Sequence, residues 1–171
     1  NRYRIIREIG RGGMGVVYLA EDKELGIEVA IKVIREELAK DKRTVEELKE
    51  EARIAMSLTH PNIMRLYTFE SSGDKKFLVM EYIDGVTLND LLAERGKLGA
   101  GEVIDYGIQI CEGLSYAHKK NVLHKDIKPS NIMVTKEGEI KITDFSIARK
   151  LRDSYTRVTK QKDTSGTLLY M

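Results

Sequence analysis

Apolar and polar positions alternate over short runs in the first half of the chain and predict strands. Residues 3–22 (YRIIREIGRGGMGVVYLAED) predict a strand, a glycine turn and a second strand. Residues 26–34 are rich in β-branched side chains, which favour a third strand. Residues 63–70 and 76–83 predict two more strands, because residues 71–74 between them (SSGD) have a composition typical of a turn.

Apolar residues recur at helical spacing in three other segments. Residues 36–58 carry an apolar stripe opposite a face of Glu and Lys, and residues 87–95 form a shorter helix that Gly96 ends. Residues 102–120 leave so little polar surface that we expect this helix to be buried on most sides, with Cys111 as a core residue.

The order of these elements predicts an α+β protein. Five strands with one inserted helix come first, then helices, then a hairpin of residues 132–134 and 140–142. We therefore expect a β-rich lobe over residues 1–83 and an α-rich lobe, incomplete in this chain, over residues 84–171. The crevice between two such lobes is a natural ligand site.

Composition narrows the class of protein. Of the 171 residues 42% are hydrophobic and 33% charged, yet the net charge is only +2, which argues against binding nucleic acid. The single cysteine allows no internal disulfide, and the sequence contains neither a signal-peptide pattern nor an apolar run long enough to span a membrane. We therefore expect a cytoplasmic protein without a membrane segment in this chain. Because the chain begins at Asn1 and stops within an apolar run, we expect a fragment of a longer protein.

The turn between the first two strands has the pattern G-x-G-x-x-G-x-V over residues 10–17. Glycines let backbone N–H groups approach phosphate oxygens closely. A glycine-rich hairpin without a ligand is the alternative, but a strand follows the glycines here, as suits a lid over a nucleotide. Lys32 lies within the third, apolar strand, where a lysine either reaches the surface or is paired. We expect pairing with a carboxylate of the following helix, and Glu51 faces inward best.

Residues 122–134 (VLHKDIKPSNIMV) place charged and amide side chains between apolar flanks. Antiparallel pairing of the hairpin that follows brings Asn131 and Asp144 together as oxygen ligands that suit Mg²⁺. Asp126 would accept a proton from a hydroxyl, and Lys128 would neutralise a phosphate. Each residue alone has a structural explanation, such as a turn, a cap or a core histidine. Together they indicate phosphoryl transfer.

These motifs resemble those of the eukaryotic-type protein kinases, which also occur in bacteria, along the chain from Tyr3 to Met171. The resemblance implies a protein-kinase-like fold, ATP as cosubstrate with Mg²⁺ or Mn²⁺, and a hinge at MEYIDG in which Met80 is the gatekeeper. The implied nucleotide site consists of Gly10, Gly12, Gly13, Gly15, Val17, Ala30, Lys32, Met80, Glu81, Tyr82, Ile83 and Met133.

The resemblance also assigns catalytic roles. The motifs HKDIKPSN and DFS match the catalytic loop and the metal-binding triplet of the family, with Asn131 and Asp144 as metal ligands. The lysine two residues after Asp126 and the segment SGTLLYM are similar to kinases that phosphorylate serine or threonine in proteins. Small-molecule kinases usually lack this combination. The implied catalytic residues are Asp126, Lys128, Lys32, Glu51 and Thr167.

The chain departs from the family pattern at three points. Lys125 and Ser146 replace the usual Arg and Gly, and the later helices of the α-rich lobe are absent. A nucleotide-binding pseudokinase or interaction module is therefore the alternative function. Self-association, or a partner that covers the incomplete lobe, is an expectation on the same ground. We also expect phosphorylation at Thr159, Thr164 or Ser165, although a polar loop without modification is an equal interpretation.

Overall fold

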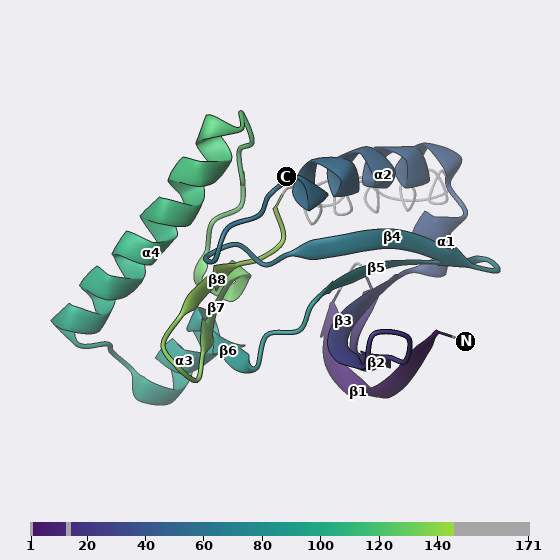
Figure 1. The fold of residues 1–171 in the computed structure, drawn as a ribbon. Helices are drawn as coiled ribbons and strands as arrows, with labels where there is room; N and C mark the ends of the chain where they lie inside the picture. The colour runs from purple at the N-terminus through teal and green to yellow at the C-terminus, as the bar shows by residue number, and fades with distance from the viewer. Residues whose placement is uncertain (1, 13–14, 146–171) are drawn as a thin grey trace, which may run out of the picture.

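The computed structural model describes residues 2–12 and 15–145, which contain two antiparallel sheets and the helices around them (Figure 1). The larger sheet has five strands in the order β1-β2-β3-β5-β4. In this order β5 lies between β3 and β4, so the sheet is complete only with β5, which ends at Glu81. The strands are β1 Tyr3–Gly12, β2 Gly15–Asp22, β3 Ile27–Ile34, β4 Leu66–Ser72 and β5 Lys75–Glu81.

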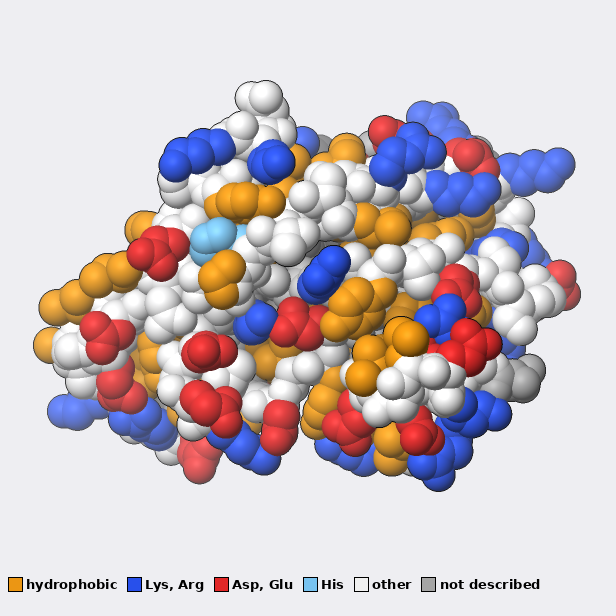
Figure 2. All heavy atoms as spheres, viewed as in Figure 1, with side chains coloured by type: hydrophobic (Ala, Val, Ile, Leu, Met, Phe, Trp, Pro, Cys, Tyr) orange, Lys and Arg blue, Asp and Glu red, His pale blue; other side chains and the backbone are white. Residues whose placement is uncertain are grey.

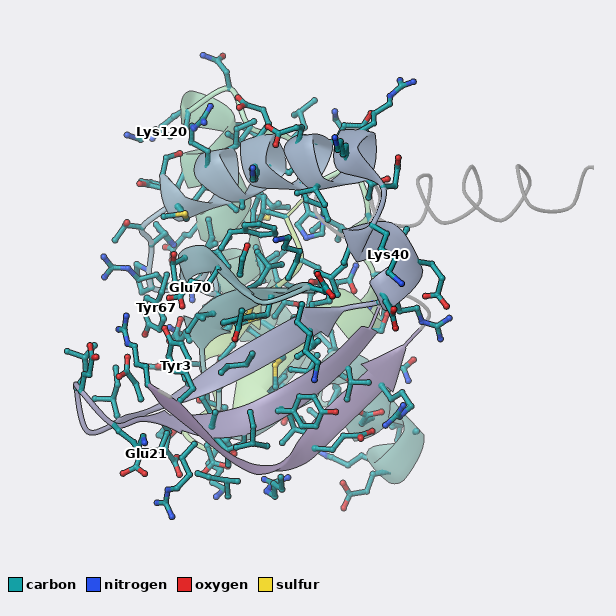
Figure 3. The ribbon with its side chains drawn as sticks, turned by 90° about the vertical axis from the view of Figure 1, so that its right-hand side faces the viewer. Tyr3, Glu21, Lys40, Tyr67, Glu70 and Lys120 are labelled. Carbon is teal, nitrogen blue, oxygen red and sulfur yellow. The ribbon has the colours of Figure 1, made fainter. Side chains whose placement is uncertain are left out.

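The five-stranded sheet is curled enough for its outer strands to meet across one face. The Tyr3 hydroxyl at the start of β1 donates a 2.7 Å hydrogen bond to Glu70 on β4, although three strands separate β1 and β4 in the sheet. The Tyr3 ring also meets the edge of the Phe77 ring on β5. Figure 3 shows Tyr3 and Glu70 on the same side of the sheet. Such curling follows from the right-handed twist of strands.

Two helices cover the other face of this sheet, where the sequence predicted one helix over residues 36–58. Helix α1 spans Glu36–Ala39 and α2 spans Lys42–Met56. The break falls at Asp41, whose carboxylate accepts a hydrogen bond from the Thr44 amide and so caps α2. The prediction of a single helix was wrong because an apolar stripe does not reveal a cap inside it. The core between helices and sheet contains Ala30, Ile34, Leu38, Leu48, Ala52, Ala55, Leu66, Leu78 and Met80.

The second half of the chain builds a small sheet of strand order β6-β7-β8 with two helices. The predicted hairpin is confirmed, and Thr87 and Gly96 begin and end the predicted shorter helix. A second core lies between α4, the hairpin and residues 58–63. The elements are β6 Gly85–Thr87, α3 Leu88–Arg95, α4 Ala100–Lys119, the 3₁₀ turn Pro129–Asn131, β7 Ile132–Thr135 and β8 Ile140–Ile142.

Residues 62–64 join the two halves. The Met64 amide donates to the Ile142 carbonyl, and the Ile142 amide donates to the Asn62 carbonyl, each at 2.9 Å. Because of these bonds, residues 62–64 pair with β8 instead of joining the larger sheet. Strand β4 therefore begins at Leu66, later than the predicted residue 63. In the same region β5 ends at Glu81, and Tyr82 and Ile83 lead into the second half.

Helix α4 is less buried than its sequence predicts. Gly113 and Ala117 are its buried residues, whereas the side chains of Val103, Ile104 and Ile108 are 54%, 61% and 53% exposed. Cys111, predicted as a core residue, is exposed too. Only the side that packs on β8 is covered by described residues, and Figure 2 shows hydrophobic side chains along the outer side of this helix. None of the helices in the described ranges is long and apolar enough to cross a membrane.

Candidate active site

A cleft separates the five-stranded sheet from the small sheet. Its upper wall comes from β1, β2 and β3, its back from the end of β5, and its floor from β7 and the turn after β8. Most residues that the sequence assigned to a nucleotide site line it, together with three that the sequence did not indicate: Ile9, Met64 and Thr143. The lining consists of Ile9, Val17, Ala30, Lys32, Met64, Met80, Glu81, Tyr82, Ile83, Met133, Thr143 and Asp144.

The strands on either side of the glycine turn border the cleft through Ile9 and Val17. Gly12 pairs with Gly15, and Gly10 lies opposite Val17, so the two strands run up to the turn in register. A Cβ on Gly15 would lie 2.0 Å from the Val33 carbonyl oxygen, which leaves no room for a side chain there. Close approach of β3 therefore explains glycine at this position.

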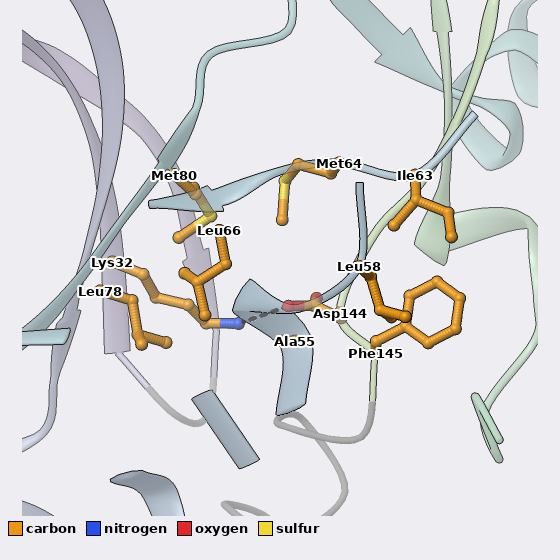
Figure 4. Close-up of a pocket in the computed structure, with 10 residues that line it drawn as sticks. All are labelled: Lys32, Ala55, Leu58, Ile63, Met64, Leu66, Leu78, Met80, Asp144 and Phe145. Atoms are coloured by element: carbon orange, nitrogen blue, oxygen red, sulfur yellow. Dashed lines mark hydrogen bonds and ion pairs between the residues drawn. The ribbon is translucent and has the colours of Figure 1, made fainter. Parts of the chain in front are cut away.

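Lys32 reaches across the cleft to Asp144. Its ammonium lies 2.9 Å from the Asp144 carboxylate, and only 12% of the lysine side chain is exposed. The surrounding pocket is otherwise apolar, so the two charges attract each other more strongly than they would in water (Figure 4). Lys32 is the main reason that the pKa of Asp144 lies below its ordinary value, because burial alone would raise it. The remaining lining of the pocket is Ala55, Leu58, Ile63, Met64, Leu66, Leu78, Met80 and Phe145.

This ion pair corrects the partner that the sequence predicted for Lys32. Glu51 is half-buried and lies one turn before Ala55 on α2, so the expected face of the helix is correct. Among the described residues, however, the ion pair of Lys32 is with Asp144. The turn after β8 brings Asp144 into the same pocket. The sequence did not predict this contact, because Lys32 and Asp144 lie far apart along the chain.

The loop before β7 is organised around a buried histidine. His124 Nε2 lies 2.7 Å from the Thr143 carbonyl oxygen, while Nδ1 accepts a hydrogen bond from the Asp126 amide. The ring also packs edge-on against Phe145. Burial lowers the pKa of His124 and favours the neutral ring that these two bonds require. The interpretation of His124 as a core histidine is thus consistent with its position, and that position fixes Asp126.

Asn131 connects the same loop to the end of the hairpin. Its amide nitrogen donates to the Asp126 carbonyl at 2.8 Å and to the Asp126 carboxylate at 3.2 Å. Its backbone carbonyl accepts from the Thr143 amide at 2.9 Å. The amide nitrogen of Asn131 is therefore committed to the loop, and its oxygen is the atom that can face a cation. The backbone of Asn131 thus pairs with Thr143, the residue before Asp144, while the meeting of Asn131 and Asp144 at one metal ion stays a prediction.

Two residues of the site have left-handed backbone conformations. Lys125 has φ 65° and Asp144 has φ 59°. Such conformations are costly for residues other than glycine and tend to occur at functional sites. Nothing in the identity of Lys125 signals this conformation. Lys128, three residues further on, lies 2.9 Å from the Asp126 carboxylate.

The oxygens of Asn131 and Asp144 fit a hard divalent cation. No cluster of three or more His, Cys, Asp or Glu side chains suited to a metal occurs within the described part of the chain. A cation that keeps few protein ligands and completes its shell with phosphate oxygens matches this donor set, as Mg²⁺ does.

Several predicted residues lie outside the described residues. These are Gly13, Ser146, Thr167 and the three predicted phosphorylation sites Thr159, Thr164 and Ser165.

The strands beside the glycine turn, Lys32 of β3 and Asp144 line one cleft, and Asn131 bonds to Thr143 at its edge. The chain belongs to the protein kinase family, because the model of the protein kinase domain matches residues 3–171. This match confirms the resemblance carried by the sequence motifs.

Named relatives agree with this family. The chain is 43% identical to a probable serine/threonine-protein kinase of Clostridium acetobutylicum over 94% of its length, and 41% identical to the serine/threonine-protein kinase PrkC of Bacillus subtilis over 99%. It spans only 24% and 26% of the length of those two relatives. The crystal structure of the PknI kinase domain of Mycobacterium tuberculosis matches with a TM-score of 0.75 and 29% identity, over 85% of this chain and 60% of that one. The predicted α+β kinase fold is thus confirmed.

Proposed function

We propose that the protein transfers the γ-phosphoryl group of ATP to serine or threonine hydroxyls of other proteins. The observation that carries this proposal is the ion pair of Lys32 with Asp144 in the cleft of a protein kinase fold, next to a loop in which Asn131 holds Asp126. Its relatives are named serine/threonine-protein kinases. We further propose that it acts in the cytoplasm, where ATP is available.

The residues divide the work of phosphoryl transfer between them. The Asp126 amide donates a hydrogen bond to His124, and Asn131 donates one to the Asp126 carboxylate, so this carboxylate is oriented and would accept the proton of the substrate hydroxyl. Lys128 beside it would offset phosphate charge during transfer. Lys32 pairs with Asp144 in this structure, so Glu51 would take its implied role of positioning Lys32 once Asp144 binds the cation, and Thr167 would position the substrate. Residues 1–83 and 84–171 remain the proposed lobes.

Asn131 and Asp144 would hold Mg²⁺, or Mn²⁺, which takes the same oxygen ligands. The bound cation would supply positive charge that neutralises the phosphate oxygens. The Asp144 carboxylate forms an ion pair with Lys32 in the present structure. Cation binding therefore requires that the carboxylate contact both Lys32 and the cation, or that this ion pair break.

The exposed side of α4 supports a proposal about partners. Its apolar side chains border a groove that includes His60, Cys111 and Tyr116. Contiguous apolar surface of this kind marks interaction sites. We propose that either a second copy of the chain or another polypeptide covers it.

The proposed reaction is tested by Asp126→Asn in the full-length protein. Loss of a general base is expected to lower the rate of labelled-phosphate transfer to a generic basic protein by roughly 10²–10⁴-fold. Asp105→Asn, on the exposed part of α4, is the matched control and should transfer phosphate at the wild-type rate. A loss below threefold in folded Asp126→Asn would remove Asp126 from this role. Tight ATP binding without transfer by the wild type would instead favour the pseudokinase alternative.

A further inference from the structure

Two ion pairs attach the β7–β8 hairpin to the chain after β5. Lys141 on β8 lies 2.6 Å from the Glu81 carboxylate, and Lys136 in the turn lies 2.5 Å from the Asp84 carboxylate. They differ in burial. The Lys141 and Glu81 side chains are 16% and 24% exposed, whereas those of Lys136 and Asp84 are 70% and 60% exposed. An exposed pair contributes little, but a partly buried pair is less screened by solvent.

Glu81 is held from several directions. One carboxylate oxygen accepts from Lys141, and the other accepts from the Arg65 amide at 3.0 Å. The Glu81 amide in turn donates to the Arg65 carbonyl at 2.8 Å. Both side-chain oxygens and the backbone amide therefore fix the point at which the chain leaves β5 and enters Tyr82 and Ile83.

Lys141 lies on a strand that is anchored by buried residues on both sides of it. Its neighbours Ile140 and Ile142 are fully buried, and Lys141 lies directly opposite Met133 on β7. Residues opposite each other in an antiparallel pair point to the same face of the sheet. The Lys141 side chain therefore lies on the same face as Met133, which lines the cleft. The ion pair thus links the floor of the cleft to its back wall.

We propose that Lys141 is a positioning residue of the nucleotide site. Through Glu81 it fixes the backbone of residues 81–83 relative to Met133, and this spacing sets the affinity for the base of the nucleotide. The proposal rests on the proposed function, because it assumes that the base lies between these residues. It assigns no contact between Lys141 and the phosphates.

The test compares two lysine substitutions in the full-length protein. Lys141→Met keeps most of the unbranched apolar side chain and removes the charged end, and Lys136→Met does the same at the exposed pair. We expect Lys141→Met to weaken ATP binding by about tenfold, within the range measured for coupled charged neighbours. Binding of inorganic triphosphate, which lacks a base, should not change. Lys136→Met should leave both affinities at their wild-type values.

A double variant separates the ion pair from a general loss of structure. Glu81→Gln removes the charge but keeps an oxygen for the Arg65 amide. If the pair acts as a unit, adding Glu81→Gln to Lys141→Met should weaken ATP binding by less than the two single effects combined.

Each contrary result has a distinct meaning. Wild-type affinity for ATP in Lys141→Met, or equal weakening of ATP and triphosphate, overturns the positioning role while leaving the proposed function intact. A wild-type protein that binds ATP but transfers no phosphate removes the proposed function alone. A wild-type protein that binds no ATP overturns both.

Discussion

His124 shows how one buried side chain can set the geometry of a site without touching a ligand. Only 2% of its surface is exposed, and each ring nitrogen has its own backbone partner, Thr143 on one side and Asp126 on the other. A protonated ring would need two acceptors, but the Asp126 amide is a donor. Protonation of His124 at low pH should therefore destabilise the loop that contains Asp126.

The pH dependence of stability tests this residue. The pKa of His124 is lower in the folded protein than its ordinary value of about 6.5, so the unfolded chain binds the extra proton. Stability from the neutral ring is therefore complete above about pH 6.5 and declines as pH falls below it. Denaturant unfolding between pH 7.5 and 5 should show this decline, and His124→Asn should flatten it.

His118→Gln, at the exposed end of α4, is the control and should keep the wild-type slope. An unchanged slope in His124→Asn would contradict the assignment. Asp144, whose folded pKa is also low, loses its contribution only near and below about pH 4 and so lies outside this range.

At the scale of elements, local pattern was sufficient wherever an element carries its own signal. Alternation predicted the first strands, and Thr87 with Gly96 marked the ends of α3. Pattern failed where a distant partner decides the outcome. Strand β6 was missed because it pairs with β7, far along the chain, and β4 starts late because residues 62–64 pair with β8. In the site, the partner of Lys32 was missed for the same reason.

The packing of α4 on β8 gives a test at this scale. A Cβ on Gly113 would lie 2.9 Å from Ile142 Cδ1 and 3.2 Å from the Asn62 carbonyl oxygen, whereas a Cβ on Gly107 meets nothing within 4 Å. Both positions are helical, so alanine gains about 0.5–1 kcal/mol of helix preference at either one. Gly107→Ala should be stabilising. Gly113→Ala should be less stable than Gly107→Ala by about 1–3 kcal/mol, the usual cost of overpacking.

Denaturant unfolding of the two variants measures this difference directly. Equal free energies of unfolding would show that α4 does not pack on β8 as closely as the structure indicates.

At the scale of the whole molecule, each half has a core of its own and the cleft lies where the halves meet. The sequence predicted the fold class, because the order of strands and helices is visible in the pattern, whereas the lobe bounds 1–83 and 84–171 stay a prediction. It did not predict which side of α4 is covered. Helical periodicity tells which residues are apolar, but only the neighbouring elements determine how many of them are buried.

The exposed side of α4 predicts self-association of the 171-residue chain. Ile104 and Ile108 lie one turn apart and are both more than half exposed, so polar replacements should not disturb a core. Light scattering should show mass rising with concentration for the wild type, and much less for Ile104→Gln with Ile108→Gln. A wild type that stays monomeric at high concentration would rule out a second copy as the partner.

The bonds between residues 62–64 and β8 have a consequence for the order in which the chain can fold as it is synthesised. Every strand of the larger sheet has been synthesised once residue 81 is made, whereas the bonds of Asn62 and Met64 form only after Ile142 is made. On the ribosome the five-stranded sheet can therefore form before β7 and the residues after β8, which make the floor of the cleft, have been synthesised. A cation held by Asn131 and Asp144 can contribute only to the later stage, because both residues lie in the second half.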